Sequence, residues 1–503
     1  MGLAPYFGKA ALSGASILQG ISAEAFRQRI ERLAVALTFD ERATDSVEGQ
    51  HLLELAANLL ARLYPTIGVF GPTNQRFTDH LHDLVLRLNP NVEFGAHSDH
   101  FNAQIIVGSP LARPPSQFTV YAGSSDWSLH VSTRHPVTVG QCKNPFGAGA
   151  AACFSAAFVF RSLFAKELNS PCPDEELCLS LARYDSGSDT TGPSLSSEIG
   201  EVALVGNGAI GNGVIWSLAR TSLRGIVHVI DPEEVDSGNP QRYILTSPAE
   251  VGTQKVAIAA NSLIGHTLKC VPHKGDWSEF LAKTAKWNLP LVCTALDTSF
   301  DRCAVQSSLP KYTLNAWTQP GDLGVSRHGF IDESACLACL YIPNKGRPSE
   351  RELVASAIRW SGDIHEIGHL LYFDAALTRP ILERIARDLG KQFDDLAQFE
   401  GKSLRGLYRE GICGGLVTVS DGQNIEVPMA FQSALAGIML AAEMVKFTCG
   451  GRPPKDGIST KIDLLGPLGS ILSQPEAKHV SSRCLCQDKD YLKAYKEKYP
   501  LLA

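Results

Sequence analysis

The segment at 201–235, EVALVGNGAIGNGVIWSLARTSLRGIVHVIDPEEV, restricts the possible folds of this chain more than any other. An apolar run, VALVG, leads into a turn in which Gly206, Gly208 and Gly211 form GxGxxG. A helix and a second apolar run follow, and Asp231 stands twenty residues after Gly211. Such a turn lets backbone N–H groups approach a phosphate, and an acid at that spacing can accept the ribose hydroxyls. The segment predicts a Rossmann-like α/β sheet that binds an adenine nucleotide; a glycine turn without a ligand is the alternative.

The residues that follow separate two kinds of nucleotide. Asn239, Arg242 and Lys255 come after Asp231, and Asp297 ends the apolar run LPLVCTALD. Hydride transfer with NAD does not require these side chains, whereas a triphosphate needs cations on its β- and γ-oxygens. Asp297 could hold Mg²⁺ beside them. The chain has no P-loop of the form GxxxxGK[ST], so it is not a phosphate-transfer ATPase of that type.

In this order of residues the chain resembles the E1-like (ThiF/MoeB/ubiquitin-activating) adenylyltransferase family. The shared pattern is a GxGxxG loop, an Asp, D-x7-N-x2-R, a Lys, and an Asp followed by an Arg, which here is Arg302. One departure is Tyr243, where the family usually has Gln. The resemblance covers about 200–475, and it implies that ATP and Mg²⁺ bind at these residues.

Four cysteines have the composition of a structural zinc site. CLAC supplies Cys336 and Cys339, and RCLC near the end supplies Cys484 and Cys486. Four thiolates form a closed tetrahedral Zn²⁺ site without an open position, which would tie the C-terminal tail to the domain. Four reduced thiols without metal are the alternative.

Cys413 is the candidate nucleophile. It precedes two glycines, an apolar run and a long apolar helix, and in the resembling family the catalytic cysteine lies before such a turn. A thiolate attacks an acyl adenylate well, and as a thioester it also leaves well. A small buried hydrophobic side chain is the alternative.

Composition excludes several classes of function. The 503 residues are 44% apolar and 19% charged, with a net charge of −6, so neither nucleic acid nor an anionic membrane is an expected partner. The longest apolar run, at 147–160, has fourteen residues and is too short to cross a bilayer. No signal peptide is recognisable, and thirteen cysteines then indicate a reducing cytoplasm.

The order of apolar runs predicts two α/β halves in succession. Residues 1–65 read as mostly helical, and strands are expected at 66–71, 103–108 and 118–123, with a buried helix at 147–164. The family resemblance makes the first half an inactive adenylation domain, with 68–75 (GVFGPTNQ) in place of a nucleotide loop. The expected domains are an inactive half, a linker, an active half interrupted by a helical catalytic-cysteine insertion, and a tail with zinc ligands: 1–185, 186–198, 199–344 with 413–475, 345–412, and 476–503.

The motif HEIGH has the spacing of a zinc protease. On a helix His365 and His369 share one face, and Glu366 could act as a general base. The motif falls inside the expected insertion and lacks a supported third ligand, so we interpret the three as ordinary helix residues.

The resemblance implies a reaction in two steps. The C-terminal glycine carboxylate of a ubiquitin-like protein is adenylated and then passes to Cys413 as a thioester, for transfer to an E2-like carrier. Bacterial E1 enzymes of Bil-type antiphage operons match best in length and arrangement, as pseudo-dimers within one chain. Arg27, Arg29 and Arg32 are candidates for an arginine that reaches the γ-phosphate from the opposite half. The alternatives are a sulfur-transferring adenylyltransferase, an NAD-dependent oxidoreductase and a non-catalytic scaffold.

Overall fold

The fold is taken from a computed structural model of the chain. It describes most of the sequence, with gaps between the following ranges: 2–72, 75–95, 100–168, 173–187, 191–284, 288–319, 321–342, 349–413, 427–450, 458–469 and 472–500.

The first half is built on a seven-stranded sheet of order β3-β2-β1-β4-β5-β6-β7. The first five strands in this order run parallel, and β6 and β7 are antiparallel additions at one edge. The strands are β1 (Ala34–Phe39), β2 (Thr66–Phe70), β3 (Glu93–Phe94), β4 (Phe101–Val107), β5 (Ser116–Ser125), β6 (Ser128–Ser132) and β7 (Glu176–Ser180).

The second half repeats this arrangement and adds one edge strand. Its order is β10-β9-β8-β11-β12-β13-β14-β15, again with five parallel strands followed by antiparallel ones. The expected pair of Rossmann-like halves is therefore confirmed. The strands are β8 (Glu198–Val205), β9 (Arg224–Asp231), β10 (Leu268–Lys274), β11 (Val292–Thr294), β12 (Thr313–Thr318), β13 (Leu323–His328), β14 (Ile458–Ile462) and β15 (Ser473–Pro475).

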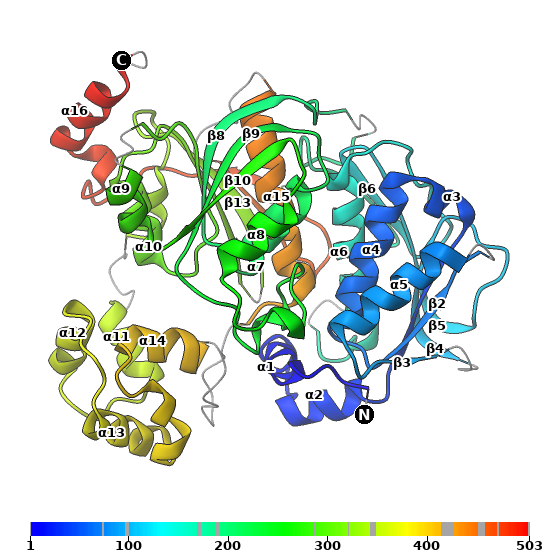
Figure 1. The fold of residues 1–503 in the computed structure, drawn as a ribbon, viewed down its shortest axis with the longest axis horizontal. Helices are drawn as coiled ribbons and strands as arrows, with labels where there is room; N and C mark the ends of the chain where they lie inside the picture. The colour runs from blue at the N-terminus through cyan, green and yellow to red at the C-terminus, as the bar shows by residue number, and fades with distance from the viewer. Residues whose placement is uncertain are drawn as a thin grey trace.

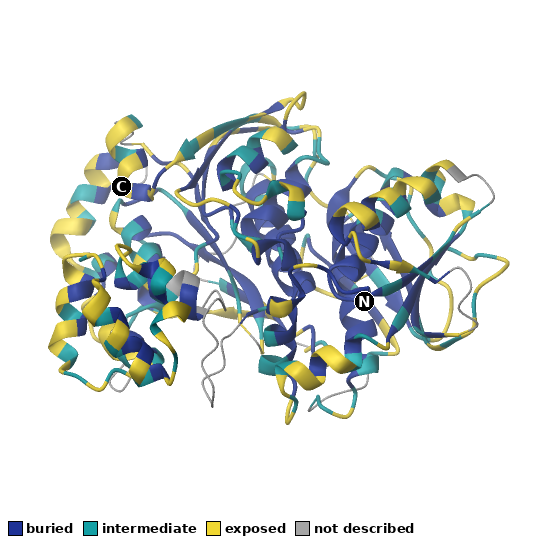
Figure 2. Ribbon diagram, turned by 60° about the horizontal axis from the view of Figure 1, so that its bottom comes forward, coloured by how far each residue is buried: buried dark blue, intermediate teal, exposed yellow. Residues whose placement is uncertain are grey.

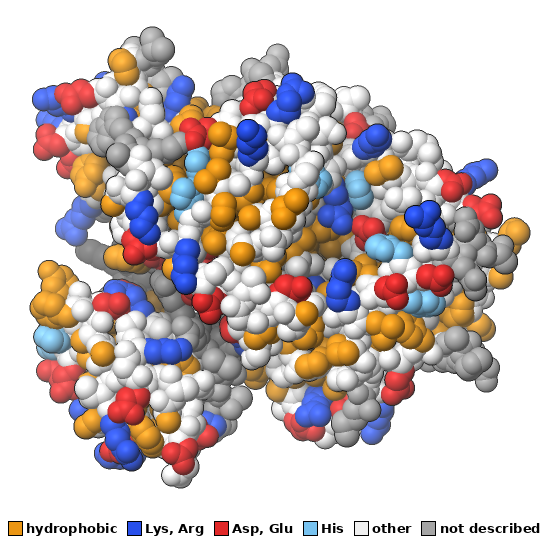
Figure 3. All heavy atoms as spheres, in the orientation of Figure 1, with side chains coloured by type: hydrophobic (Ala, Val, Ile, Leu, Met, Phe, Trp, Pro, Cys, Tyr) orange, Lys and Arg blue, Asp and Glu red, His pale blue; other side chains and the backbone are white. Residues whose placement is uncertain are grey.

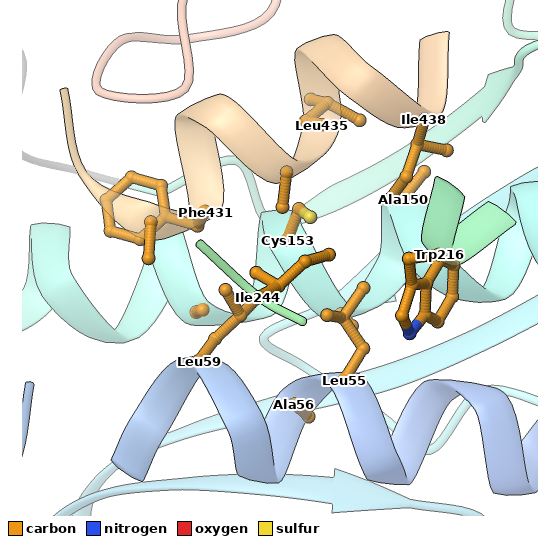
Figure 4. Close-up of a cluster of buried hydrophobic side chains, with 14 of the residues drawn as sticks. Leu55, Ala56, Leu59, Ala150, Cys153, Trp216, Ile244, Phe431, Leu435 and Ile438 are labelled. Atoms are coloured by element: carbon orange, nitrogen blue, oxygen red, sulfur yellow. The ribbon is translucent and has the colours of Figure 1, made fainter. Parts of the chain in front are cut away.

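Helices from both halves meet in one core between the sheets (Figure 1). Figure 4 shows Leu55 and Leu59 of one helix facing Cys153, Trp216 and Leu435 of three others. Two of these helices are long and apolar enough to cross a membrane, but 89% of the apolar window of each is buried inside the protein, as in the core of a soluble fold. The four are α4 (Val47–Ala61), α6 (Pro145–Leu163), α7 (Ala209–Leu218) and α15 (Ala430–Cys449).

The remaining helices pack at the edges of this core or, in the case of α9, α10 and α16, in smaller apolar clusters of the second half. They are α1 (Phe7–Ile17), α2 (Ala23–Ile30), α3 (Glu41–Asp45), α5 (Gln75–Leu88), α8 (Lys255–Ser262), α9 (Trp277–Thr284), α10 (Ser299–Ser307) and α16 (Lys489–Lys498).

A helical lobe between β13 and α15 stands apart from the sheets (Figures 1 and 3). Leu382, Ile385 and Phe399 belong to its own small apolar core, and most of its outer surface is exposed (Figure 2). Its elements are α11 (Glu350–Ala357), α12 (Ile364–Tyr372), α13 (Arg379–Leu389), α14 (Leu404–Gly406) and the π-helix η6 (Leu407–Cys413). We call residues 349–413 the insertion.

The first strand of the first sheet corrects the sequence reading. Residues 34–39 (β1) lie within a stretch interpreted as mostly helical, yet they form the central strand beside β2 and β4. The segment 68–75, which was expected to stand in place of a nucleotide loop, therefore overlaps the end of β2. The position equivalent to the second half's glycine turn is the end of β1, where Asp40 caps α3 instead.

Candidate functional site

The glycine turn lies between β8 and α7. Gly206 has φ +94°, and a Cβ there would lie 2.5 Å from the carbonyl oxygen of Ala295, so the turn requires glycine. Gly208 is the N-cap of α7. A Cβ on Gly211 would lie 2.5 Å from the Gly206 oxygen, which explains its place in the motif although it does not line the cavity described below.

Asp231 ends β9 beside this turn. Its carboxylate accepts hydrogen bonds from the backbone N–H of Asn207 (2.7 Å) and of Glu233 (2.9 Å). Burial raises the pKa of Asp231, although the nearby Lys255 ammonium and the two N–H donors act in the opposite direction. The carboxylate is thus fixed at the position where the sequence predicts ribose recognition.

Lys255 and Arg242 both lie close to the ring of Tyr243. The Lys255 ammonium donates to Glu233, and it lies 5.2 Å from the centre of the Tyr243 ring. Burial opposes its charge, but the pull of Tyr243, Asp231 and Glu233 raises the pKa of Lys255. The Arg242 guanidinium lies 5.8 Å from the same ring. Tyr243, the one departure from the pattern of the resembling family, thus contacts both cations through its ring.

A third cation comes from the first half of the chain. Lys9 of α1 forms an ion pair with Asp236 (3.1 Å), and only 7% of its side chain is exposed. Asp236 is in turn fixed by Asn239, whose side-chain amide donates to it at 2.6 Å. Burial lowers the pKa of Lys9, the positive Arg242 and Lys255 lower it further, and Asp236 opposes them. Sequence reasoning missed Lys9, since 227 residues separate it from its partner.

The three arginines expected to reach the γ-phosphate from the first half lie away from the cavity. Arg27 pairs with Glu31 (3.4 Å) on the same helix, and Arg29 donates to Glu167 (2.6 Å). Arg32 is exposed after α2. None of the three lines the cavity, so their proposed contact with the γ-phosphate is wrong for this structure.

Asp297 lies exposed in the loop after β11. Arg302 holds this loop, because its guanidinium donates to the carbonyl oxygen of Leu296 and to the side chain of Asn315 (3.0 Å). Asp297 therefore remains available to a cation, whereas Arg302 supports the loop.

One cavity of about 1570 Å³ collects these side chains. It is larger than the ~300–1,000 Å³ of ordinary ligand pockets, so it has room for a nucleotide and a second substrate. Two buried polar atoms in its lining have no hydrogen-bond partner among the described residues: Nη1 of Arg242 and Oγ of Ser433. An unsatisfied guanidinium nitrogen beside two ammonium groups is the donor set that a triphosphate requires. The predicted residues in the lining are Gly206, Gly208, Asp231, Asn239, Arg242, Lys255, Asp297 and Arg302.

The insertion forms another part of the cavity wall. Leu353, Tyr408 and Ile412 line it. Cys413 follows Ile412 at the end of η6, but its side chain lies outside what the structure describes. The backbone therefore brings the predicted nucleophile to the rim of the same cavity.

The four predicted zinc ligands come together as a buried cluster. Cys336 Sγ lies 3.9 Å from Cys339 Sγ and 3.4 Å from Cys484 Sγ, and Cys339 Sγ lies 3.5 Å from Cys486 Sγ. A tetrahedral ion with Zn–S bonds of about 2.3 Å places sulfurs roughly 3.8 Å apart, so the donor set fits Zn²⁺. The CxC spacing of the second pair does not prevent this arrangement.

The HEIGH motif lies on α12 of the insertion. His365, Glu366 and His369 are all exposed, and Glu366 pairs with Arg384 (3.2 Å). Among the described residues, the cysteine cluster is the group of three or more potential ligands close enough to share a metal ion.

Family models match a segment of each half. Residues 195–485 match the ThiF family, and residues 38–165 match Prokaryotic E2 family C. The second match, which runs from β1 into α6, was not expected from the sequence.

A relative and several solved structures are similar to the chain. Uncharacterized protein y4jF of Sinorhizobium fredii (strain NBRC 101917 / NGR234) is 40% identical over 509 residues, which cover 99% of this chain and 98% of that protein. Crystal structures of E. coli MccB with ATP and with MccA-N7isoASN are 14% identical, with TM-scores of 0.35 over 57% of this chain and 66% of theirs. Because its ThiF match covers more than half of its length, the chain belongs to the ThiF family of E1-like adenylyltransferases.

Proposed function

We propose that this chain activates a ubiquitin-like protein that ends in glycine. The observation that carries the proposal is the convergence of Arg242, Lys255 and Lys9 with Asp231 in one cavity. A carboxylate placed to bind the ribose hydroxyls, with three cations beside it, suits a nucleoside triphosphate better than a dinucleotide. A dinucleotide carries fewer negative charges in that position.

The first step is adenylation. The carboxylate of the partner's C-terminal glycine attacks the α-phosphorus of ATP, a new P–O bond forms, and pyrophosphate leaves. Arg242, Lys255 and Lys9 stabilise the negative charge that gathers on the leaving group. Asp297 is the residue that would hold Mg²⁺, which supplies further charge neutralisation at the phosphates.

The second step forms a thioester. The thiolate of Cys413 attacks the carbonyl carbon of the acyl adenylate, the S–C bond forms, and AMP leaves as the C–O bond breaks. The Cys413 thiol loses its proton to solvent before this attack, so that the thiolate is the nucleophile. The position of Ile412 in the cavity wall supports this assignment. An E2-like carrier protein then accepts the acyl group, in the cytoplasm and in the service of antiviral defence.

Exchange of labelled pyrophosphate into ATP tests the adenylation step. We expect a ubiquitin-like protein ending in Gly to support exchange with the unchanged chain, and Lys255→Ala and Asp297→Ala to lower the rate about a hundredfold or more. Lys269→Ala, an exposed lysine on β10, is the matched control and should leave the rate unchanged. Full exchange by the Lys255→Ala chain would refute the proposed role of the cavity.

The match to Prokaryotic E2 family C raises a second candidate function, in which the first half carries the acyl group itself. Within residues 38–165 the cysteines are Cys142 and Cys153, and Cys153 is fully buried. Burial and the adjacent Glu48 carboxyl raise the pKa of Cys142 to about 12, which leaves very little thiolate at neutral pH. We therefore favour Cys413 as the acceptor.

Non-reducing gel electrophoresis separates the two cysteines. A thiol-sensitive adduct with the ubiquitin-like protein should form on the Cys142→Ala chain and disappear in the Cys413→Ala chain, which keeps pyrophosphate exchange. The opposite pattern would assign the acceptor to the first half. A partner released with a thiocarboxylate terminus would instead identify a sulfur-transferring enzyme.

A further inference from the structure

The segment that carries the triphosphate ligands is held from the other half of the chain. Residues 239–246 contain Asn239, Arg242 and Tyr243, and they begin with the short 3-10 helix η1 (Asn239–Gln241). Three of the segment's backbone carbonyl groups accept hydrogen bonds from two side chains of the first half, one in α4 and one on the residue that caps the C-terminus of α4. We call Asn58 and Arg62, the two residues that donate them, the α4 clamp.

The clamp has a specific geometry. The Arg62 guanidinium donates to the carbonyl oxygen of Pro240 and to that of Thr246, the latter at 2.9 Å. Its Nε donates to the side-chain oxygen of Asn58 at 2.8 Å, and the Asn58 amide donates to the Ile244 oxygen at 3.0 Å. Two carbonyls six residues apart are therefore bridged by one planar guanidinium, which a lysine cannot do with a single nitrogen.

Burial of the Arg62 charge is unfavourable in free energy unless its donors find partners. Arg62 is only 1% exposed, and none of its described hydrogen bonds goes to a carboxylate. Burial lowers the pKa of Arg62 to about 10, so the group is still charged at neutral pH. A charge buried without a hydrogen-bonded acid is unfavourable unless its donors are satisfied, and here backbone oxygens satisfy them.

The rest of the segment is fixed on its other side. The Leu245 N–H donates to Asn212 of α7 at 3.1 Å, and the Ile244 side chain lies between α4 and α15 in Figure 4. The segment is thus gripped between α7 and the clamp, while the Arg242 side chain extends to the cavity. Neither Arg62 nor Asn58 lines that cavity.

We propose that Arg62 and Asn58 are positioning residues, through which the first half sets the orientation of Arg242 toward the triphosphate. This inference rests on the proposed binding of ATP. It assigns the first half a role in the second half's chemistry that does not require a nucleotide site of its own.

Nucleotides with and without the outer phosphates test this assignment. Asp231 and the glycine turn lie outside the clamped segment, so a positioning role predicts that Arg62→Met binds AMP within about twofold of the unchanged chain. Its affinity for ATP and its rate of pyrophosphate exchange should fall about tenfold or more, because small misplacements of a charged ligand have effects of that size. Arg62→Lys should recover part of the rate.

Two further variants keep the test informative if Arg62→Met folds poorly. Asn58→Ala removes the bond to Ile244 with a smaller change in the core, and it should show the same selective loss for ATP. Arg29→Met is the control, because Arg29 donates to Leu163 and Glu167 within the first half. It should leave binding of both nucleotides unchanged.

Failure of the positioning role and failure of the proposed function would give different results. Equal losses of AMP and ATP binding in Arg62→Met and Asn58→Ala would show that the clamp supports only the fold, and unchanged exchange in both would show that it has no role. Failure of the unchanged chain to bind ATP at all would instead refute the proposed function.

Discussion

For individual residues, the sequence predicted the cavity-lining side chains of the second half far better than the one that the first half contributes. Asp231, Arg242, Lys255 and Asp297 follow one another at spacings that a known family shares, and all four line one cavity. Lys9 belongs to no motif, and only the packing of α1 against the second half brings it to Asp236. Short patterns record local geometry, whereas contacts between distant segments depend on the whole fold.

Lys9 provides the first prediction at this scale. Lys9→Ala should weaken ATP binding and lower pyrophosphate exchange about tenfold or more, since it removes a buried cation from the leaving-group side of the site. Titration with ATP and the exchange assay measure both effects, and Arg27→Ala is the control. Loss of activity in the Arg27→Ala chain with full activity in Lys9→Ala would reverse the assignment.

A buried ion pair provides the second prediction for single residues. Glu443 of α15 accepts from Arg327 Nε at 2.6 Å and also pairs with Lys446. Burial would raise the pKa of Glu443, but Arg327 and Lys446 outweigh it and lower the pKa from 4.5 to about 2. Because the folded pKa is the lower one, this stabilisation is complete above about pH 4.5 and is lost as the pH falls toward 2.

Thermal unfolding of the Glu443→Gln variant measures how much this ion pair stabilises the fold. The substitution should cost about 3–5 kcal/mol at neutral pH, because it leaves the Arg327 charge buried without its partner. The unchanged chain should lose stability more steeply than the variant between pH 4.5 and 2. Parallel pH profiles for the two chains would contradict the account.

At the scale of elements, the sequence predicted the long helices and most central strands, because their apolar runs are long or end at glycine. The helices α6 and α15 and the strands β2, β4, β5, β8 and β9 lie where they were expected. The strand β1 was not predicted, since the run AVALTF is short and lies in a stretch read as mostly helical, where periodicity does not distinguish a strand from a helix. That error moved the expected nucleotide-loop position from β1 to β2.

The cysteine cluster belongs to this scale because it joins two distant elements. Purified chain should contain about one Zn²⁺, measured by plasma mass spectrometry, and Cys336→Ser should lose it. Without the ion, the tail from Cys484 through α16 should become more sensitive to proteases, because only contacts such as the hydrogen bonds from Tyr495 and Lys498 would then hold it to the second half. A chain with four titratable thiols, no metal and an equally resistant tail would refute the zinc assignment.

Considered as a whole molecule, the two halves have equivalent strand orders, apart from one added edge strand, and they share one core and line one cavity. The first half has Asp40 where the second has its glycine turn, and it contributes Lys9 and the α4 clamp to the second half's site. The insertion closes the cavity on another side and ends at Cys413. The first half and the insertion thus both add side chains or support to the cavity of the second half.

Analysis of the products from ATP labelled in its γ-phosphate tests the central claim most directly. With a ubiquitin-like protein ending in Gly, the account predicts that all of the label leaves as pyrophosphate and that AMP appears in equal amount. Release of the label as inorganic phosphate, or reduction of NAD⁺ with no consumption of ATP, would contradict it.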